Sequence, residues 1–433
     1  MDHGDKRTLA SNFGYLMVVQ CANYLLPLIT LPYLFRVLTA EKYGLIVFAQ
    51  AFTQYFVILT DYGFSLSATR EVSTHRADRA QVSRIFCSVM VAKLALLVLS
   101  FLLLLALTAT VPKFRADWQV YLLAFGAVAG HVLFPLWLFQ GLERMKYIAL
   151  LHLVAKLVFT ALVFAVVREK NHYVLVPLFN ALGFLVMGIL GLSLALTRFG
   201  IRVTVPSVTF LWGQVKAAHH VFVGQMATSL YTTSNVVILG FFADDATVGY
   251  FAAGEKIVRA VQGLEIPFSQ AAYPYVSKLA SQSPRAALSF IREMTLPWLV
   301  LTGVVSGILF VWAGTIAQIV LGQTSEQSAQ VIRILAPLPL VVGWAILYAN
   351  LFLVGFGFAR TWSRIILSVG TLSLIGALFF VAVLKMSYVG LCLNVVLTEV
   401  LILLLSYLAY RHARRQVLER DVAHEEACGH ADR

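Results

Sequence analysis

Long apolar runs separated by short polar loops dominate the chain. Each run has about 20 residues or more, the length that an α-helix needs to cross the hydrocarbon core of a membrane. Transmembrane β-strands would instead give short segments of alternating hydrophobicity. The pattern therefore predicts an all-α polytopic membrane protein with twelve transmembrane helices. Their approximate limits are 11–35, 44–66, 85–110, 117–140, 147–167, 173–197, 217–242, 248–276, 293–320, 330–355, 362–384 and 387–410.

A weak internal repeat divides the chain into two halves. Four matches occur at a constant offset of 205 residues: Gln20 with Gln225, Gly44 with Gly249, Gln50 with Glu255, and Gln54 with Arg259. The longest polar loop on the N-terminal side of the membrane, 197–218, falls between the halves. We therefore expect two pseudo-symmetric six-helix bundles, an arrangement common in transporters, with the substrate site at the interface of the repeats. The predicted parts are an N-terminal bundle (1–205), a cytoplasmic linker (206–216), a C-terminal bundle (217–410) and a charged cytoplasmic tail (411–433).

Lysine and arginine are concentrated on one side of the predicted membrane. The segments on the side of the N-terminus carry 21 of them, and the segments on the other side carry 7. Because cytoplasmic loops are enriched in these residues, both termini are predicted to be cytoplasmic. Much of the net charge of +12 then reflects topology and contact with anionic membrane lipids, so it does not indicate nucleic-acid binding.

Composition excludes most soluble functions. The chain is 60% hydrophobic and 12% charged, whereas an average soluble domain is about 25% charged. It has no GxxxxGK[ST], GxSxG or HExxH motif, and its loops are too short for a soluble catalytic domain. The four cysteines have neither CxxC nor metal-ligand spacing. We therefore expect no enzyme, no catalytic residue, no cofactor, no metal and no disulfide.

One predicted span, 248–276, carries an unusual number of charges. Glu255 and Arg259 are four residues apart, the spacing of an ion pair on one helix face, and Gln262 extends the same polar stripe. Lys256 and Glu265 lie on the flanks of that stripe. Pro267 and Pro274 predict kinks within the span. The polar face is expected to line a cavity, with snorkelling of the long side chains to the membrane surface as the alternative.

Other charges lie deep in predicted spans. Lys93 and Lys156 fall near the centres of the third and fifth spans, and Glu399 is central in the twelfth. His131 and His152 also lie on apolar helices, where packing is the favoured role over proton relay. A cavity lined by several cations and few anions suits an anionic substrate such as a phosphate or pyrophosphate.

Two strings resemble a known family. The string ITLPYLFRVLTAEKYGLIVFAQAFTQYFVILTDYGFSLSATREVSTHR (29–76) resembles the polysaccharide-transporter family of O-antigen and related lipid-linked oligosaccharide flippases (Wzx-like). That family belongs to the multidrug/oligosaccharidyl-lipid/polysaccharide exporter superfamily. The string GYFAAGEKIVRAVQGLEIPFSQAAYPYVSKL (249–279) is similar to the second signature of the same family. The strings occupy corresponding points of the two halves.

The resemblance implies two six-helix bundles around a central cavity that opens alternately to each side. The expected substrate is an undecaprenyl-pyrophosphate-linked oligosaccharide, moved from the cytoplasmic to the periplasmic leaflet of a bacterial inner membrane and coupled to a proton or sodium gradient. Expected partners are membrane lipids, a polysaccharide polymerase and a chain-length regulator. The matching strings, the repeat and the depth of charges in the spans together supply the candidate residues. They are Arg259, Lys256, Lys156, Lys93, Arg36, Arg70, Gln50 and Gln54 for substrate binding, and Glu255, Glu399 and Asp61 for ion coupling.

Two other functions stay open. A cation-coupled multidrug exporter of the same superfamily would favour a cavity rich in carboxylates and aromatics, and this one is predominantly basic. A non-transporting membrane scaffold for glycan synthesis would not need charges deep in its spans. Arg36 and Arg70 would also serve as anchors at the membrane edge.

Overall fold

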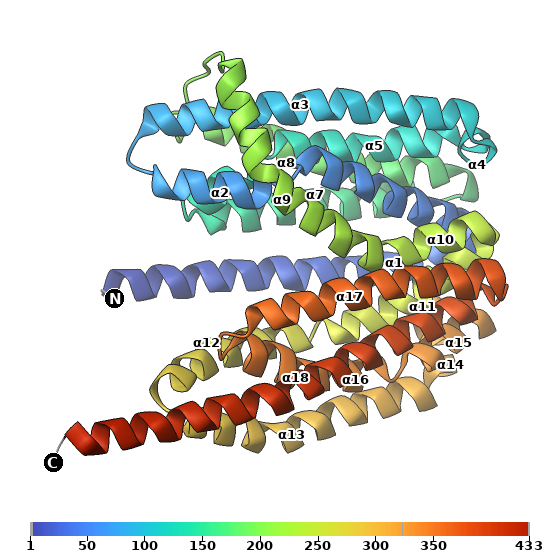
Figure 1. Ribbon diagram of the computed structural model, residues 1–433. Coiled ribbons are helices and arrows are strands. Elements are labelled where there is room, and N and C mark those ends of the chain that lie inside the picture. The colour runs from blue at the N-terminus through green and yellow to red at the C-terminus, as the bar shows by residue number, and fades with distance from the viewer. Residues whose placement is uncertain (1–2, 323, 432–433) are drawn as a thin grey trace. The chain divides into compact units, whose positions relative to one another are not determined.

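Helices and their connecting loops make up the computed structural model, which describes residues 3–322 and 324–431 (Figure 1). No strand is present in these two ranges. Side chains are described for 25–226, 228–229, 233–322 and 324–419. The chain forms two compact units, Met1–Gly249 and Tyr250–Arg433, and each is treated by itself below.

The first unit contains the elements that precede residue 250. Their bounds are α1 (His3–Asp61), α2 (Phe64–Thr74), α3 (Arg79–Thr110), α4 (Pro112–Ala116), α5 (Trp118–Leu133), α6 (Leu136–Gly141), α7 (Met145–Val166), the 3-10 helix η1 (Lys170–Val174), α8 (Leu175–Thr197), α9 (Val208–Thr232), α10 (Ser234–Phe242) and the start of α11 (Asp245–Gln262). Helix α8 packs extensively against α5 and α7, and α1 packs against the same group. In Figure 1 the axes of the long helices of this unit are roughly parallel to one another.

Helix α1 is interrupted at Thr39, whose φ of 73° and ψ of 160° are not helical. The interruption falls between the first two predicted spans, 11–35 and 44–66. Helix α9 and helix α10 pack against α1, and α9 also contacts α2 and α3. As a result, residues 208–249 are grouped with the first unit, although they follow the linker expected at 206–216. The predicted limits of the two bundles stay a prediction.

The second unit contains the C-terminal part of α11 and the elements after it. Their bounds are α12 (Glu265–Gln282), α13 (Pro284–Val311), α14 (Ala313–Leu321), α15 (Glu326–Leu335), α16 (Leu338–Ile346), the π-helix η2 (Leu347–Val354), α17 (Ala359–Leu378), the π-helix η3 (Phe379–Val383) and α18 (Ser387–Ala431). Its core includes Trp298, which stacks on Phe268 at a centroid distance of 3.7 Å and donates a hydrogen bond from Nε1 to the carbonyl oxygen of Gly343 at 2.9 Å.

The span predicted at 248–276 is not one helix. Helix α11 ends at Gln262 and α12 begins at Glu265, with Gly263 and Leu264 between them. Pro267 explains the break, because it has no N–H to donate to the carbonyl of Gly263 and its ring would crowd that carbonyl in a continuous helix. Pro274, by contrast, lies inside α12. The polar stripe of Glu255, Arg259 and Gln262 therefore lies on α11 alone.

Nine segments of the described chain are long and apolar enough to cross a membrane. The spans predicted at 217–242 and 248–276 are not among them. Residues 25–35 of the first predicted span and the whole of the second fall within a single segment, so the count of twelve is not confirmed. The nine segments are Leu25–Thr74, Arg79–Thr110, Trp118–Gly141, Met145–Val166, Lys170–Thr197, Pro284–Val311, Glu326–Val354, Ala359–Val383 and Ser387–Glu419.

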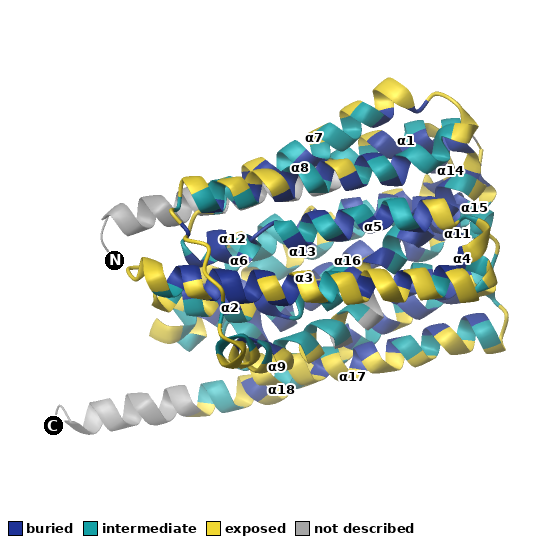
Figure 2. Ribbon diagram, turned by 90° about the horizontal axis from the view of Figure 1, so that it is seen from above, coloured by how far each residue is buried: buried dark blue, intermediate teal, exposed yellow. Residues whose placement is uncertain are grey.

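Large apolar side chains are exposed along these segments, as expected where lipid replaces water. Helix α3 exposes Val98, Leu99 and Leu102, and α13 exposes Leu296 and Val311. Figure 2 shows exposed residues along α3. Contiguous exposed apolar surface of this kind is unusual for a soluble monomer. Together with the nine apolar segments, it identifies a multi-pass membrane protein.

Candidate functional site

Each unit contains a helix break beside an acidic residue. In the first unit α1 ends at Asp61, and Tyr62 (φ 47°) and Gly63 (φ 80°) both have left-handed backbone conformations before α2 begins. In the second unit Gly263 and Leu264 separate α11 from Glu265, the first residue of α12. A Cβ at Gly63 would lie 2.8 Å from the carbonyl oxygen of Ala218 in α9, so glycine is required there for space as well as for φ.

Asp61 forms an ion pair with Lys93 inside the first unit. The Lys93 Nζ lies 3.5 Å from Asp61 Oδ1, and the Lys93 side chain is only 4% exposed. Asp61 Oδ2 also accepts a hydrogen bond from the backbone N–H of Ser65 in the first turn of α2 at 3.3 Å. The carboxylate thus stabilises the start of α2 and neutralises a lysine that has almost no access to solvent or lipid headgroups.

Two lysines of the first unit act on the two histidines that lie on its apolar helices. The charges of Lys93 on α3 and Lys156 on α7 both act on His131 on α5, and Lys156 also acts on His152. The His131 ring packs on Phe184 at a centroid distance of 4.3 Å, and the His152 ring meets Phe134 edge-on at 5.5 Å. Both histidines therefore pack against aromatic rings, and Lys156 is a further cation of this unit besides Lys93.

Glu255 and Arg259 form the ion pair that their spacing predicts. Glu255 Oε1 lies 3.4 Å from Arg259 Nε and 3.5 Å from Nη2, and Arg259 Nη1 donates to Gln262 Oε1 at 3.4 Å. The Glu255 side chain is 16% exposed and that of Arg259 is 40% exposed. The guanidinium is therefore held along α11 while one side stays accessible. Within the second unit, the charge of Arg259 also acts on Glu399 of α18.

Glu265 is the residue that the sequence analysis did not select. It is 5% exposed, and neither carboxylate oxygen has a hydrogen-bond partner among the described residues. The charge of Glu399 on α18 acts on it. A buried acidic group without hydrogen bonds is costly and calls for an explanation, such as a functional role. The sequence signal was available, since Glu265 lies between Gly263 and Pro267 in an apolar stretch.

Lys256 differs from the other deep cations of the second unit. It is half-buried on α11, and it forms no ion pair with any residue of the described chain. Its neighbours Glu255 and Arg259 form an ion pair with each other. Lys256 therefore contributes positive charge that Glu255 does not cancel.

The remaining predicted residues lie nearer the surface. Arg36, Gln54 and Arg70 are exposed, and Gln50 is half-buried. Gln50 and Gln54 lie on the part of α1 after Thr39, four residues apart, as do Glu255 and Arg259 on α11. Cys87 and Cys392 are buried free thiols, and the side chains of Cys21 and Cys428 lie outside the described residues.

The arrangement provides two kinds of chemistry. The first unit offers the ammonium and imidazole groups of Lys93, Lys156, His131 and His152 together with the carboxylate of Asp61. The second offers the guanidinium of Arg259 and the ammonium of Lys256 together with the carboxylates of Glu255, Glu265 and Glu399. Cations of this kind bind phosphate oxygens, and neighbouring carboxylates bind protons or metal cations.

Two curated relatives are similar to this chain over most of its length. A protein of Escherichia coli (strain K12) with the curated name "Putative O-antigen transporter" is 30% identical over 92% of this chain and 95% of its own length. A protein of Shigella dysenteriae with the same name is 28% identical over 92% of this chain and 98% of its own length.

Solved structures with similar folds come from membrane transporters. The lipid II flippase MurJ in an inward closed conformation has a TM-score of 0.70 at 11% identity, over 95% of this chain and 91% of that chain. An inward-facing multidrug resistance MATE family transporter of the MOP superfamily has a TM-score of 0.64 at 13% identity, over 94% and 99%. At such low identity these matches show the fold alone. The family described as "Polysaccharide biosynthesis protein" matches residues 9–280, and the chain belongs to this family.

Proposed function

We propose that this protein is a flippase for a lipid-linked oligosaccharide. The substrate would be an undecaprenyl-pyrophosphate-linked repeat unit of O-antigen or a related glycan, moved from the cytoplasmic to the periplasmic leaflet of the bacterial inner membrane by alternating access. Family membership and relatives named as O-antigen transporters support the substrate class. The polymerase and chain-length regulator remain proposed partners, because a flipped repeat unit is the material that a polymerase would consume.

One observation carries the proposal: each unit holds a cation in an ion pair with a carboxylate on the helix that precedes its break. These cations are Lys93, paired with Asp61, and Arg259, paired with Glu255. Charged side chains within membrane-spanning helices, such as that of Lys93, are rare and in membrane proteins mark substrate or ion pathways. A pyrophosphate is a strong acceptor for guanidinium and ammonium groups. Lys256 would add a third contact, since it has no ion pair in the described chain.

The carboxylates of the second unit suit coupling to an ion gradient. The charge of Glu399 acts on Glu265, which has no hydrogen-bond partner in the described chain. Uptake of a proton or a sodium ion would relieve the repulsion between them. In exchange transport the ion would bind from the periplasmic side after substrate release and would allow the empty carrier to return inward. Glu255 and Asp61 are further candidates for this role.

The direct test is flipping of a fluorescent undecaprenyl-pyrophosphate oligosaccharide in proteoliposomes. The wild-type protein should expose the glycan to a membrane-impermeant lectin, and Lys256→Gln should slow this exposure. Lys278→Gln is the matched control, because Lys278 is exposed on α12 of the same unit. Flipping by the Lys256 variant at the wild-type rate would show that Lys256 is not part of the substrate site. No flipping by the wild-type protein, with efflux of cationic drugs instead, would favour the multidrug exporter.

A further inference from the structure

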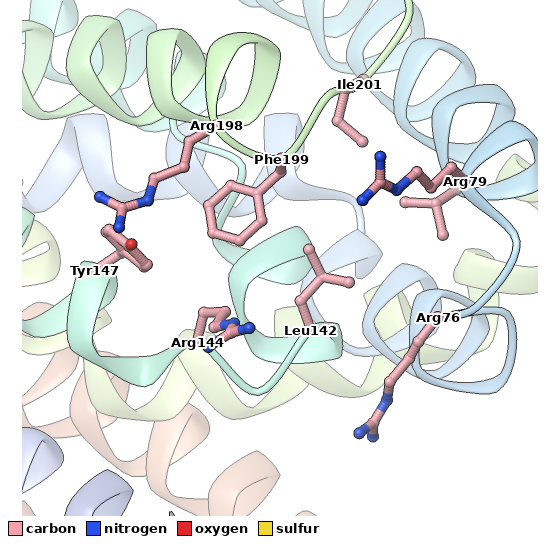
Figure 3. Close-up of a pocket in the computed structure, with 9 residues that line it drawn as sticks. Arg76, Arg79, Leu142, Arg144, Tyr147, Arg198, Phe199 and Ile201 are labelled. Atoms are coloured by element: carbon pink, nitrogen blue, oxygen red, sulfur yellow. The ribbon is translucent and has the colours of Figure 1, made fainter.

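Four arginines line a pocket at one end of the helices of the first unit. Arg76, Arg79, Arg144 and Arg198 surround a volume of about 450 Å³ together with Val82, Leu142, Tyr147, Phe199 and Ile201 (Figure 3). Arg76 comes from the loop before α3, Arg79 is the first residue of α3, Arg144 directly precedes α7, and Arg198 directly follows α8. Because α3, α7 and α8 all belong to apolar segments long enough to cross a membrane, lipid headgroups are expected at the helix ends where the pocket lies.

Two of the four guanidinium groups are already engaged. Arg76 Nη2 lies 2.8 Å from Glu143 Oε1. The Arg198 guanidinium lies over the Tyr147 ring, 5.6 Å from its centroid. In Figure 3 Arg76 extends away from Arg79, consistent with its attachment to Glu143.

Arg79 and Arg144 have no such engagement. Neither forms an ion pair or cation–π contact with any residue of the described chain. In Figure 3 Arg79 extends from the start of α3 toward Ile201 and Phe199, into the space between the elements. Arg144 immediately precedes α7, which begins at Met145 without a side-chain cap. The partial positive charge of that helix N-terminus adds to the charge of the arginines.

The same pocket has apolar walls. Leu142, Ile201, Val82 and Phe199 line it beside the arginines. A soluble anion would gain nothing from these side chains, whereas the glycerol or prenyl carbons next to a lipid phosphate would be buried against them. With one of four positive charges balanced by Glu143, the pocket favours a headgroup that carries net negative charge.

From this geometry we propose that the arginine pocket binds the phosphate of an anionic lipid headgroup, with Arg79 and Arg144 as the direct ligands. Two membrane sources supply that chemistry: an anionic phospholipid and a polyprenyl pyrophosphate. The site is separate from Lys93, Arg259 and Lys256, none of which lines the pocket. The proposal holds for either source and does not depend on transport.

Native mass spectrometry of the full-length protein in detergent tests the proposal. The added lipids are phosphatidylcholine, phosphatidylglycerol, cardiolipin and undecaprenyl pyrophosphate, and inorganic pyrophosphate is the lipid-free probe. We expect at least one anionic lipid to bind more tightly than phosphatidylcholine. The double variant Arg79→Gln/Arg144→Gln should weaken that binding by about tenfold or more, because two charge-assisted contacts are lost. Binding of phosphatidylglycerol or cardiolipin would identify a phospholipid site, and binding of undecaprenyl pyrophosphate alone would identify a docking site for the substrate headgroup.

The matched control is Arg202→Gln/Lys146→Gln. It removes the same charge from two exposed residues at the same end of the unit that do not line the pocket. An equal loss of binding in this control would show that only diffuse surface charge acts, and would overturn the proposal. Equal affinity for inorganic pyrophosphate and for the lipids would overturn the assignment to a lipid. Arg79→Lys keeps the charge without the planar fork, so partial retention of binding by this variant would support direct contact with phosphate even if the double variant were poorly folded.

Discussion

Gly44 and Gly249 lie against each other where the second part of α1 crosses the start of α11. A Cβ built on Gly44 would be 2.6 Å from the backbone nitrogen of Gly249 and would overlap the carbonyl oxygen of Asp245. The two glycines are 205 residues apart, and each is the fifth residue of its helix counted from Ala40 and Asp245. Lys113 Nζ, 3.1 Å from Asp245 Oδ1, holds the start of α11 in place. Equivalent positions of the repeat thus meet at a crossing with no room for a side chain.

Replacing Gly44 with valine should destabilise the first unit. The added atoms would force the two backbones apart, and overpacking of this kind costs about 1–3 kcal/mol. The measurement is the unfolding temperature of the purified protein in detergent, which should fall. Gly307→Ala serves as the control, because no atom lies within 4 Å of the position its Cβ would take. If the Gly44 variant were as stable as the control, the backbones at the crossing would not be in close contact.

Neutralising Asp61 alone should be more harmful than removing its ion pair entirely. Asp61→Asn leaves the ammonium of Lys93 buried without its counter-ion. Breaking a fully buried pair costs about 3–5 kcal/mol. The Asp61 side chain is 23% exposed, so a smaller loss, on the order of 2 kcal/mol, is expected. Adding Lys93→Met should restore much of the stability. Thermal unfolding of the two single variants and the double variant gives the coupling energy, and additive effects would contradict a direct interaction.

Loss of positive charge inside the helices should abolish surface glycan. Arg259→Ala and Lys156→Ala should prevent display of surface polysaccharide in a deletion strain, although both proteins insert into the membrane at wild-type levels. Immunoblotting of membranes verifies insertion, and glycan staining measures function. Arg292→Gln is the comparison, since Arg292 is exposed on α13. Normal surface glycan in the two alanine variants would remove these residues from the substrate site and favour a scaffold role.

Amide substitutions should separate ion coupling from substrate movement. Glu399→Gln removes one of the two carboxylates whose repulsion the coupling ion relieves. Flipping driven by a pH or sodium gradient should therefore be lost, while exchange of labelled for unlabelled substrate at equilibrium continues. Glu265→Gln should behave in the same way and should also raise thermal stability, because it removes a buried charge that has no hydrogen bond in the described chain. Gradient-driven flipping at the wild-type rate in both variants would exclude these two carboxylates from coupling.

Apolar run lengths and local spacing predicted much of the architecture. The all-helical membrane fold follows from about 20-residue apolar runs. The Glu255–Arg259 pair follows from a spacing of four residues within one helix. The ion pair of Lys93 with Asp61 could not be predicted, because it joins α3 to the end of α1 and depends on how those helices pack.

Backbone breaks were harder to predict than helices. Thr39 adopts a positive φ in a stretch without glycine or proline, so no residue type in the sequence marks that interruption. Pro267 does mark the break at Gly263 and Leu264, but proline within a membrane helix is also compatible with a simple kink, as Pro274 shows in α12. The arginine pocket could not be predicted from the sequence for a related reason. Its arginines were counted as evidence for topology, and only the fold brings the ends of α3, α7 and α8 together.

The shared break beside an acidic residue has an evolutionary consequence. If the halves descend from one duplicated ancestor, they kept the jointed helix and then diverged in chemistry. The first copy holds Asp61 in an ion pair with Lys93. The second holds Glu399 and Glu265, of which Glu265 has no hydrogen-bond partner in the described chain. Each copy has thus specialised, and neither contains the full set of groups. A protein assembled from two identical copies of one half would retain the helical framework and lose either its basic interior or its carboxylate pair.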